Sequence, residues 1–147
     1  METDSFRFDY TGSGYILNEV KDKSVTKITV PDEISGVKIT EIAEWTFEGC
    51  TELKEVKLPE SIEIIGAAAF YRCGSLESIN IPKSIKNIGE WAFYACNSLT
   101  EITLPQGLEE IKEGAFYDCK GLLKVKLPSS VKSIGENAFP EQCKVTK

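Results

Sequence analysis

The fold of this chain is decided by residues 58–126, which repeat one pattern of 23 residues three times. The copies read LPESIEIIGAAAFYRCGSLESIN (58–80), IPKSIKNIGEWAFYACNSLTEIT (81–103) and LPQGLEEIKEGAFYDCKGLLKVK (104–126). A period of about 20 to 50 residues indicates a solenoid, in which each unit buries its apolar side chains by stacking on its neighbours. We therefore predict a single repeat domain over residues 1–147.

Composition and charge narrow the range of partners. The chain is 41% hydrophobic and 27% charged, which is ordinary for a globular protein, and its formal net charge is -6. Attraction to nucleic acid or to an anionic membrane needs clustered lysine and arginine, so we expect neither partner. No apolar run approaches the roughly 20 residues of a membrane span. The opening METDSFRFDY lacks the basic and apolar segments of a signal peptide.

Each unit contains two extended segments. The first has the form apolar-x-x-apolar-x-apolar, as in Leu76, Ile79 and Ile81, and the second has two aliphatic residues three apart, as in Ile85 and Ile88. Proline follows the first segment at positions 31, 59, 82, 105 and 128. Proline cannot donate to a strand ladder, so each first strand should stop there. We expect both segments to be short strands that pair in parallel with their equivalents in the next unit.

A corner with a small residue beside a phenylalanine follows the second segment. These pairs are Ala69-Phe70, Ala92-Phe93, Ala115-Phe116 and Ala138-Phe139, with Thr46-Phe47 as the divergent case. A ring can enter the core at a narrow bend only where the backbone passes closely, which a small neighbour permits. We expect a single helical turn at this corner and a stack of the five rings. Gly66, Gly89 and Gly135 precede the corner, but Ala43 and Lys112 share their slot. No glycine-only backbone angle is therefore predicted there.

Four of the five cysteines, Cys50, Cys73, Cys96 and Cys119, recur at the repeat spacing. Their place in the repeat predicts a file of buried thiols, since free cysteine behaves as a small apolar residue. Disulfides are the alternative, because stacked units about 4.8 Å apart lie within bridging distance. The chain has no histidine and no Cys-x-x-Cys, so neither a metal nor another cofactor is expected.

The two ends differ from the repeats. Alternating apolar residues around Gly12-Ser13-Gly14 predict a β-hairpin, and we assign residues 1–24 to an N-terminal cap. About five repeats then occupy residues 25–147, of which the first is lengthened by five residues near Glu33–Lys38 and the last is truncated. In that last unit Cys143 is displaced by one position. A bare C-terminal end would invite another molecule to stack on it.

The pattern as a whole, with Ala-Phe-x-x-Cys-x-x-Leu at a fixed period, resembles the BspA-type leucine-rich repeat proteins over residues 25–147. The resemblance implies a leucine-rich-repeat solenoid, a right-handed α/β-type superhelix of mostly short parallel β-strands with short helical turns. Its first strands would line a concave side. The resemblance also implies adhesion or protein recognition at the cell surface or in a secreted form, and it supplies no catalytic residues.

Slots that vary between repeats are free to serve a ligand. On the expected concave face they form two columns, Lys27, Glu55, Ser78, Glu101 and Lys124, and beside them Thr29, Lys57, Asn80, Thr103 and Lys126. These small, polar side chains of mixed charge suit the recognition of a protein surface. The alternative is that they are merely solvated strand residues.

A second candidate is a convex patch of Tyr71, Tyr94 and Tyr117, since tyrosine is enriched in interface hot spots. Its alternative is that the rings lie half-buried along that face with their hydroxyls in water.

We therefore expect a noncatalytic module that binds an unidentified protein with its concave face. Without histidine a nucleophile would lack its usual base. The rival expectation is a structural or assembly unit, or a fragment of a longer surface array, which self-associates end to end through an open C-terminal end.

Overall fold

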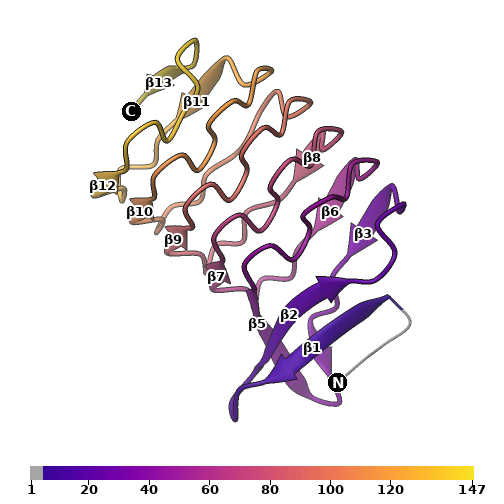
Figure 1. Cartoon of the computed structure of the whole chain (residues 1–147). Coiled ribbons are helices and arrows are strands. Elements are labelled where there is room, and N and C mark those ends of the chain that lie inside the picture. Colours follow the sequence, from indigo (N-terminus) through magenta and orange to yellow (C-terminus); the bar gives the residue numbers. More distant parts are fainter. Residues whose placement is uncertain (1–4) are drawn as a thin grey trace.

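Residues 5–147 are described by a computed structural model, and they form a β-solenoid (Figure 1). The N-terminal hairpin and the insertion contribute β1 (Phe6–Tyr10), β2 (Tyr15–Val20) and β4 (Glu33–Ile34). The first strands of the units are β3 (Lys27–Thr29), β6 (Glu55–Lys57), β8 (Ser78–Ile79), β11 (Lys124–Lys126) and β13 (Lys144–Thr146). The return strands are β5 (Val37–Ile42), β7 (Ile64–Ile65), β9 (Asn87–Ile88), β10 (Glu110–Ile111) and β12 (Ser133–Ile134).

The two sets of strands lie along two faces of the solenoid, which we name the first-strand face and the return face (Figure 1). On the return face β5, β7, β9, β10 and β12 pair in parallel without interruption. The register joins Ile42 to Ile65, Ile65 to Ile88, and Ile88 to Ile111, so side chains 23 residues apart become neighbours. The predicted parallel stacking of units is therefore confirmed.

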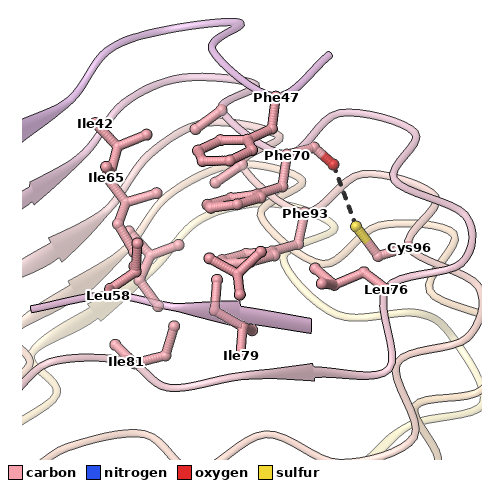
Figure 2. Packing of buried hydrophobic residues seen from close by; sticks show 14 of the residues in the cluster. Ile42, Phe47, Leu58, Ile65, Phe70, Leu76, Ile79, Ile81, Phe93 and Cys96 are labelled. Carbon is pink, nitrogen blue, oxygen red and sulfur yellow. Dashed lines mark hydrogen bonds between the residues drawn. The ribbon is translucent and has the colours of Figure 1, made fainter. Parts of the chain in front are cut away.

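A stack of five phenylalanine rings runs through the core, as the sequence predicted. Successive ring centroids are 4.5 Å apart from Phe47 to Phe70, 5.1 Å from Phe70 to Phe93 and from Phe93 to Phe116, and 5.4 Å from Phe116 to Phe139. The first four rings are fully buried, and Phe139 is half-buried. Figure 2 shows the first three rings one above another, with the aliphatic side chains of both faces around them.

The thiols of Cys50, Cys73, Cys96 and Cys119 are free and fully buried. Each of the last three donates a hydrogen bond to the carbonyl of a phenylalanine in the preceding unit. The S···O distances are 3.2 Å from Cys73 to Phe47, 3.2 Å from Cys96 to Phe70 and 2.9 Å from Cys119 to Phe93. Figure 2 shows the bond from Cys96. The cysteine file therefore links the stacked units by S–H···O contacts, while Cys143 is only partly buried.

The predicted helical turn at the corner is wrong, and so is the α/β description, because residues 5–147 contain no helix. Ala68 and Arg72 adopt left-handed φ angles of 52° and 57°, which a right-handed helical turn excludes. Alternate N–H groups of the corner bond to the next unit instead, while the N–H groups between them form turns within the unit, as from Tyr71 to the Ala68 carbonyl at 3.0 Å. The N–H of Phe70 donates to the carbonyl of Ala92 at 2.8 Å, and the next unit repeats this bond. A helix would satisfy these groups within the unit, whereas lateral bonds tie each corner to its neighbour.

Left-handed φ angles recur at two slots of the repeat. The first slot holds Trp45, Ala68, Trp91, Gly114 and Asn137, and the second, four residues later, holds Gly49, Arg72, Ala95 and Asp118. Glycine recurs just before the corner for a reason other than a left-handed φ angle. A Cβ on Gly89 would lie 2.7 Å from the carbonyl carbon of Gly66, so this slot keeps two backbones in close contact. As expected from the sequence, no glycine-only φ is involved at Gly66, Gly89 or Gly135.

This close approach predicts the effect of alanine at Gly89. Gly89→Ala should lower the free energy of unfolding by about 1–3 kcal/mol, the usual cost of overpacking, because the new methyl group meets backbone rather than a flexible side chain. Gly74→Ala is the matched control, since a Cβ there has no atom within 4 Å. It should be neutral or stabilise by up to about 1 kcal/mol. Urea unfolding of the two variants measures the difference, and equal stabilities would contradict the steric argument.

The N-terminal hairpin covers the first unit. Strands β1 and β2 pair antiparallel, and β2 continues the return face by pairing in parallel with β5. Phe8 and Leu17 are fully buried against the repeats. The five added residues form a second hairpin of β4 and β5, with Ser35 and Gly36 at φ 51° and 80°. Sequence reasoning located this insertion but missed its form, although two consecutive positive φ angles in a Ser-Gly pair are typical of a type I′ turn.

Candidate functional site

The N-terminal half of the first-strand face is an ordered sheet whose charges neutralise one another. Strands β3, β6 and β8 bring Lys27, Glu55 and Ser78 side by side, as the sequence predicted for this column. The Glu55 carboxylate lies 3.1 Å from the Lys27 ammonium and 3.7 Å from that of Lys57. The hydrogen bond from Lys27 and then its charge lower the pKa of Glu55. Lys27, Glu55 and Lys57 thus form an ion-paired group, beside which Thr29 is exposed.

Asn80 has a structural partner rather than a free side chain. Its Oδ1 accepts a hydrogen bond from the N–H of Leu58 at 2.8 Å, and its Nδ2 donates to the Leu58 carbonyl at 2.8 Å. The side-chain amide therefore takes the place of a backbone strand partner for Leu58. Asn80 was predicted to face a ligand; its amide extends the sheet, and the side chain is exposed in the wall of the crevice described below.

The sheet stops at the unit that contains Glu101 and Thr103. Residues 101–104 form no strand, and they pair with neither β8 nor β11. Ile102 is half-buried there, whereas the equivalent Val56 and Val125 are 1% and 3% exposed. The prediction that every first segment pairs with its equivalent in the next unit is therefore wrong at this unit. On the return face β10 pairs with both β9 and β12, so the units remain joined there. This pairing does not require the first strands of the same units to form hydrogen bonds, and on the first-strand face the units are separate.

Crevices open on both sides of this unpaired segment. The larger has a volume of about 810 Å³ and lies between residues 77–81 and 101–106, with Glu60 and Lys83 at its rim. The smaller, of about 350 Å³, lies between residues 102–106 and 126–128. No hydrogen bond joins the backbone of residues 77–81 to that of residues 99–104. The larger crevice therefore has backbone edges as well as side chains in its walls.

The C-terminal half of the face carries charges that are not neutralised. Lys124 and Lys126 are exposed, and neither has an ion-pair partner within residues 5–147. The parallel register of β11 and β13 places Lys144 directly beside Lys124. Glu101 is likewise exposed and unpaired in the described chain. The face therefore divides into an ion-paired N-terminal part and an open, mainly cationic C-terminal part, a division that the repeat alignment alone did not reveal.

The tyrosines of the second candidate surface stack in a file. Ring centroids are 4.6 Å apart from Tyr71 to Tyr94 and 5.9 Å apart from Tyr94 to Tyr117. Tyr71 and Tyr94 are half-buried and Tyr117 is 45% exposed. Trp45 contacts Tyr71 edge-on at 5.3 Å between centroids. The predicted tyrosine patch is thus a physical unit, and the structure brings both tryptophans beside it.

No group of three or more histidine, cysteine, aspartate or glutamate side chains is arranged to hold a metal ion within residues 5–147. In the same range no helix has the length and hydropathy needed to cross a bilayer.

A solenoid of parallel strands with a recurring leucine, isoleucine and phenylalanine core is a leucine-rich-repeat array. The chain belongs to the BspA type leucine-rich repeat family, whose sequence pattern matches residues 18–146 in six copies. The first copy thus begins within the segment that we assigned to the cap. No significant match was found among functionally curated proteins.

Solved structures show the same architecture in bacterial proteins. The leucine-rich repeat protein of T. pallidum is 34% identical, with a TM-score of 0.91, over 97% of this chain and 67% of that chain. A leucine-rich repeat protein from Bacteroides ovatus is 28% identical, with a TM-score of 0.88, over 100% of this chain and 41% of that chain. A leucine-rich cell surface protein from Faecalibacterium prausnitzii, at 23% identity and a TM-score of 0.64, shares the fold over 97% of this chain and 52% of that chain.

Proposed function

We propose that this chain is a noncatalytic protein-binding module that works in adhesion, at the cell surface or in a secreted form. The binding site in this proposal extends along the first-strand face from the edge of β8, across the larger crevice, to β11. Family membership supports the repeat module, and the absence of histidine from the chain supports a role without catalysis. The partner is a protein that offers an extended segment.

The larger crevice is the observation that carries this proposal. The edge of β8 that faces residues 101–104 makes no backbone hydrogen bond across the crevice. An extended peptide can add itself to such an edge, because its own N–H and C=O groups pair with the exposed backbone while its side chains enter the pockets. Apolar contact is available from Ile79, Ile81 and Ile102 in the crevice wall.

The unpaired lysines favour a partner with negative charge. Lys124, Lys126 and Lys144 stand together beyond the crevice, and no carboxylate of residues 5–147 forms an ion pair with them. Complementary charge raises the association rate and excludes like-charged partners. We therefore propose an extended segment with acidic residues at the end that lies over β11.

Reversal of these charges tests the proposal. Decapeptides selected from a random display library should be rich in acidic residues, and Lys124→Glu/Lys126→Glu should weaken their binding by about tenfold or more. Lys38→Glu/Lys112→Glu, which changes the net charge equally but lies along the return strands, should stay within about twofold. Isothermal titration calorimetry gives the affinities. Amide chemical shifts should change in residues 77–81 and 101–104.

Three outcomes would contradict the proposal: no selected peptide, equal weakening by both charge reversals, or shift changes confined to another surface.

Self-association through the C-terminal end is the alternative function. Ile134 and Val145 are 45% and 39% exposed near that end, an unusual position for aliphatic strand residues. Light scattering over a range of concentrations separates the two proposals. A particle mass that rises with concentration, and falls on Ile134→Asp, favours assembly, whereas a constant monomer that still binds the selected peptides favours recognition.

A further inference from the structure

A hollow beside the tyrosine file has the composition of a site for an organic cation. It has a volume of about 250 Å³ and is lined by Trp91, Tyr94 and Tyr117, with Glu113, Gly114, Tyr71 and Asn137 around them. Small-molecule pockets usually exceed about 300 Å³, so this hollow suits a single side chain rather than a drug-sized ligand. Trp91 remains 44% exposed beside it.

The two tryptophans have different neighbours in the following unit, and this difference explains why Trp91 borders an open hollow. Trp45 and Trp91 occupy the same slot, and the residue one unit further on is Ala68 for Trp45 but Gly114 for Trp91. The indole of Trp91 lies directly against Gly114, because a Cβ on that glycine would be 2.0 Å from the Trp91 Cδ1 atom. Trp45 instead meets Tyr71 edge-on. Gly114 thus lets the Trp91 indole settle on the backbone and leaves space against Tyr94 and Tyr117.

One carboxylate without a counter-ion, that of Glu113, lines the hollow. Glu44, Glu90, Glu113 and Glu136 recur at one slot of the repeat, and all four are exposed. None of them forms an ion pair with another residue of the described chain. Aromatic faces and carboxylates both attract a cation, and the two effects act together where they adjoin.

The chain itself places a guanidinium on this tyrosine file at one position. The guanidinium carbon of Arg72 lies 5.3 Å from the centroid of the Tyr71 ring. The residues that correspond to Arg72 in the next two units are Ala95 and Asp118, so Tyr94 and Tyr117 have no equivalent cation. A planar guanidinium stacks on aromatic rings and also bonds carboxylates in a forked geometry, which a lysine ammonium does not reproduce.

From these observations we propose that the hollow formed by Trp91, Tyr94, Gly114 and Tyr117 binds an arginine side chain of a partner protein. Glu113 would pair with the guanidinium, whose face would lie against the aromatic rings. This site lies at the Ala-Phe corner, apart from the first-strand face, and does not depend on the function proposed for that face.

The test uses Trp45→Phe, which leaves Trp91 as the sole tryptophan of the folded protein. N-acetyl-arginine amide should change the Trp91 fluorescence saturably at low salt, and N-acetyl-citrulline amide, which is neutral and nearly isosteric, should bind about tenfold more weakly. Glu113→Gln should weaken the arginine probe by about threefold to tenfold. Lys124→Glu/Lys126→Glu should leave its affinity unchanged, which distinguishes this site from the first-strand face.

Gly114→Ala is the sharpest variant. The fold accepts alanine at this slot, since Ala68 occupies it with a φ of 52°, but the new methyl group must displace the Trp91 indole. Loss of arginine binding by about tenfold or more in a folded Gly114→Ala protein supports the site. If this variant does not fold, the test rests on Glu113→Gln, for which an unchanged affinity for arginine would contradict the proposal. The proposal would be overturned if arginine gave no saturable response or if citrulline gave an equal one. It would also be overturned if the carbohydrate cellohexaose, rather than arginine, changed the fluorescence.

Discussion

Phe93→Ala is expected to lower the free energy of unfolding by about 3–5 kcal/mol, the range observed when a buried phenylalanine is truncated to alanine. Phe93 stands in the middle of the ring stack, with centroids 5.1 Å away on both sides and no exposed surface. Its loss removes two ring contacts and leaves a cavity that neighbours held by lateral backbone bonds cannot fill. Since a whole domain is usually stable by only about 5–15 kcal/mol, this loss is a large fraction of the total stability.

Phe139→Ala provides the matched control. The same ring there is half-buried and has one neighbour, Phe116, at 5.4 Å. Its replacement should cost no more than about 1–2 kcal/mol, because less apolar area leaves water. Guanidinium chloride unfolding, followed by circular dichroism, measures both variants. Equal losses would mean that the stack contributes no more in its centre than at its end.

Alkaline pH is expected to destabilise the native chain through its buried thiols. Burial raises the pKa of Cys73 and of Cys96 above the ordinary value of 9.0. Below pH 9 these thiols are protonated in both states, so their contribution is complete. Above it the unfolded chain loses protons that the folded chain keeps, and stability falls with rising pH. At about 1.4 kcal/mol per pH unit for each thiol, the two together should remove about 3 kcal/mol between pH 8 and pH 10.

The variant Cys73→Ala/Cys96→Ala separates this effect from other titrations. The double variant should lose about 3 kcal/mol less than the native chain over the same interval. Urea unfolding at the two pH values, with a reductant present, gives the comparison. Identical pH dependence in the two proteins would show that the buried thiols do not control it.

The repeat made most of the solenoid predictable. A pattern that returns every 23 residues places equivalent side chains in register, so the phenylalanine stack, the thiol file and the parallel pairing all followed from one period. The corner was not predictable in the same way. Whether all of its N–H groups bond within the unit, or alternate ones bond to the next unit, depends on φ at Ala68 and Arg72, residues that carry no left-handed signature.

The candidate sites show the same division. Repeat alignment identified the variable columns and the tyrosines, because these slots differ while the core slots do not. It could not foresee that Asn80 pairs with Leu58, that residues 101–104 leave the sheet, or that Trp91 rests on Gly114. Each of these three features depends on the local distance between two neighbouring units. That distance varies along the array, although the sequence period does not.

By itself, therefore, the sequence determined the solenoid architecture of this protein and the identity of its core, because repeated units bury their apolar side chains by stacking on one another. The tertiary structure alone decided where the array opens and which charges remain unpaired. Those features arise from small differences in packing between units that are nearly identical in sequence. The two proposed binding surfaces lie at such places, the crevice beside residues 101–104 and the hollow above Gly114.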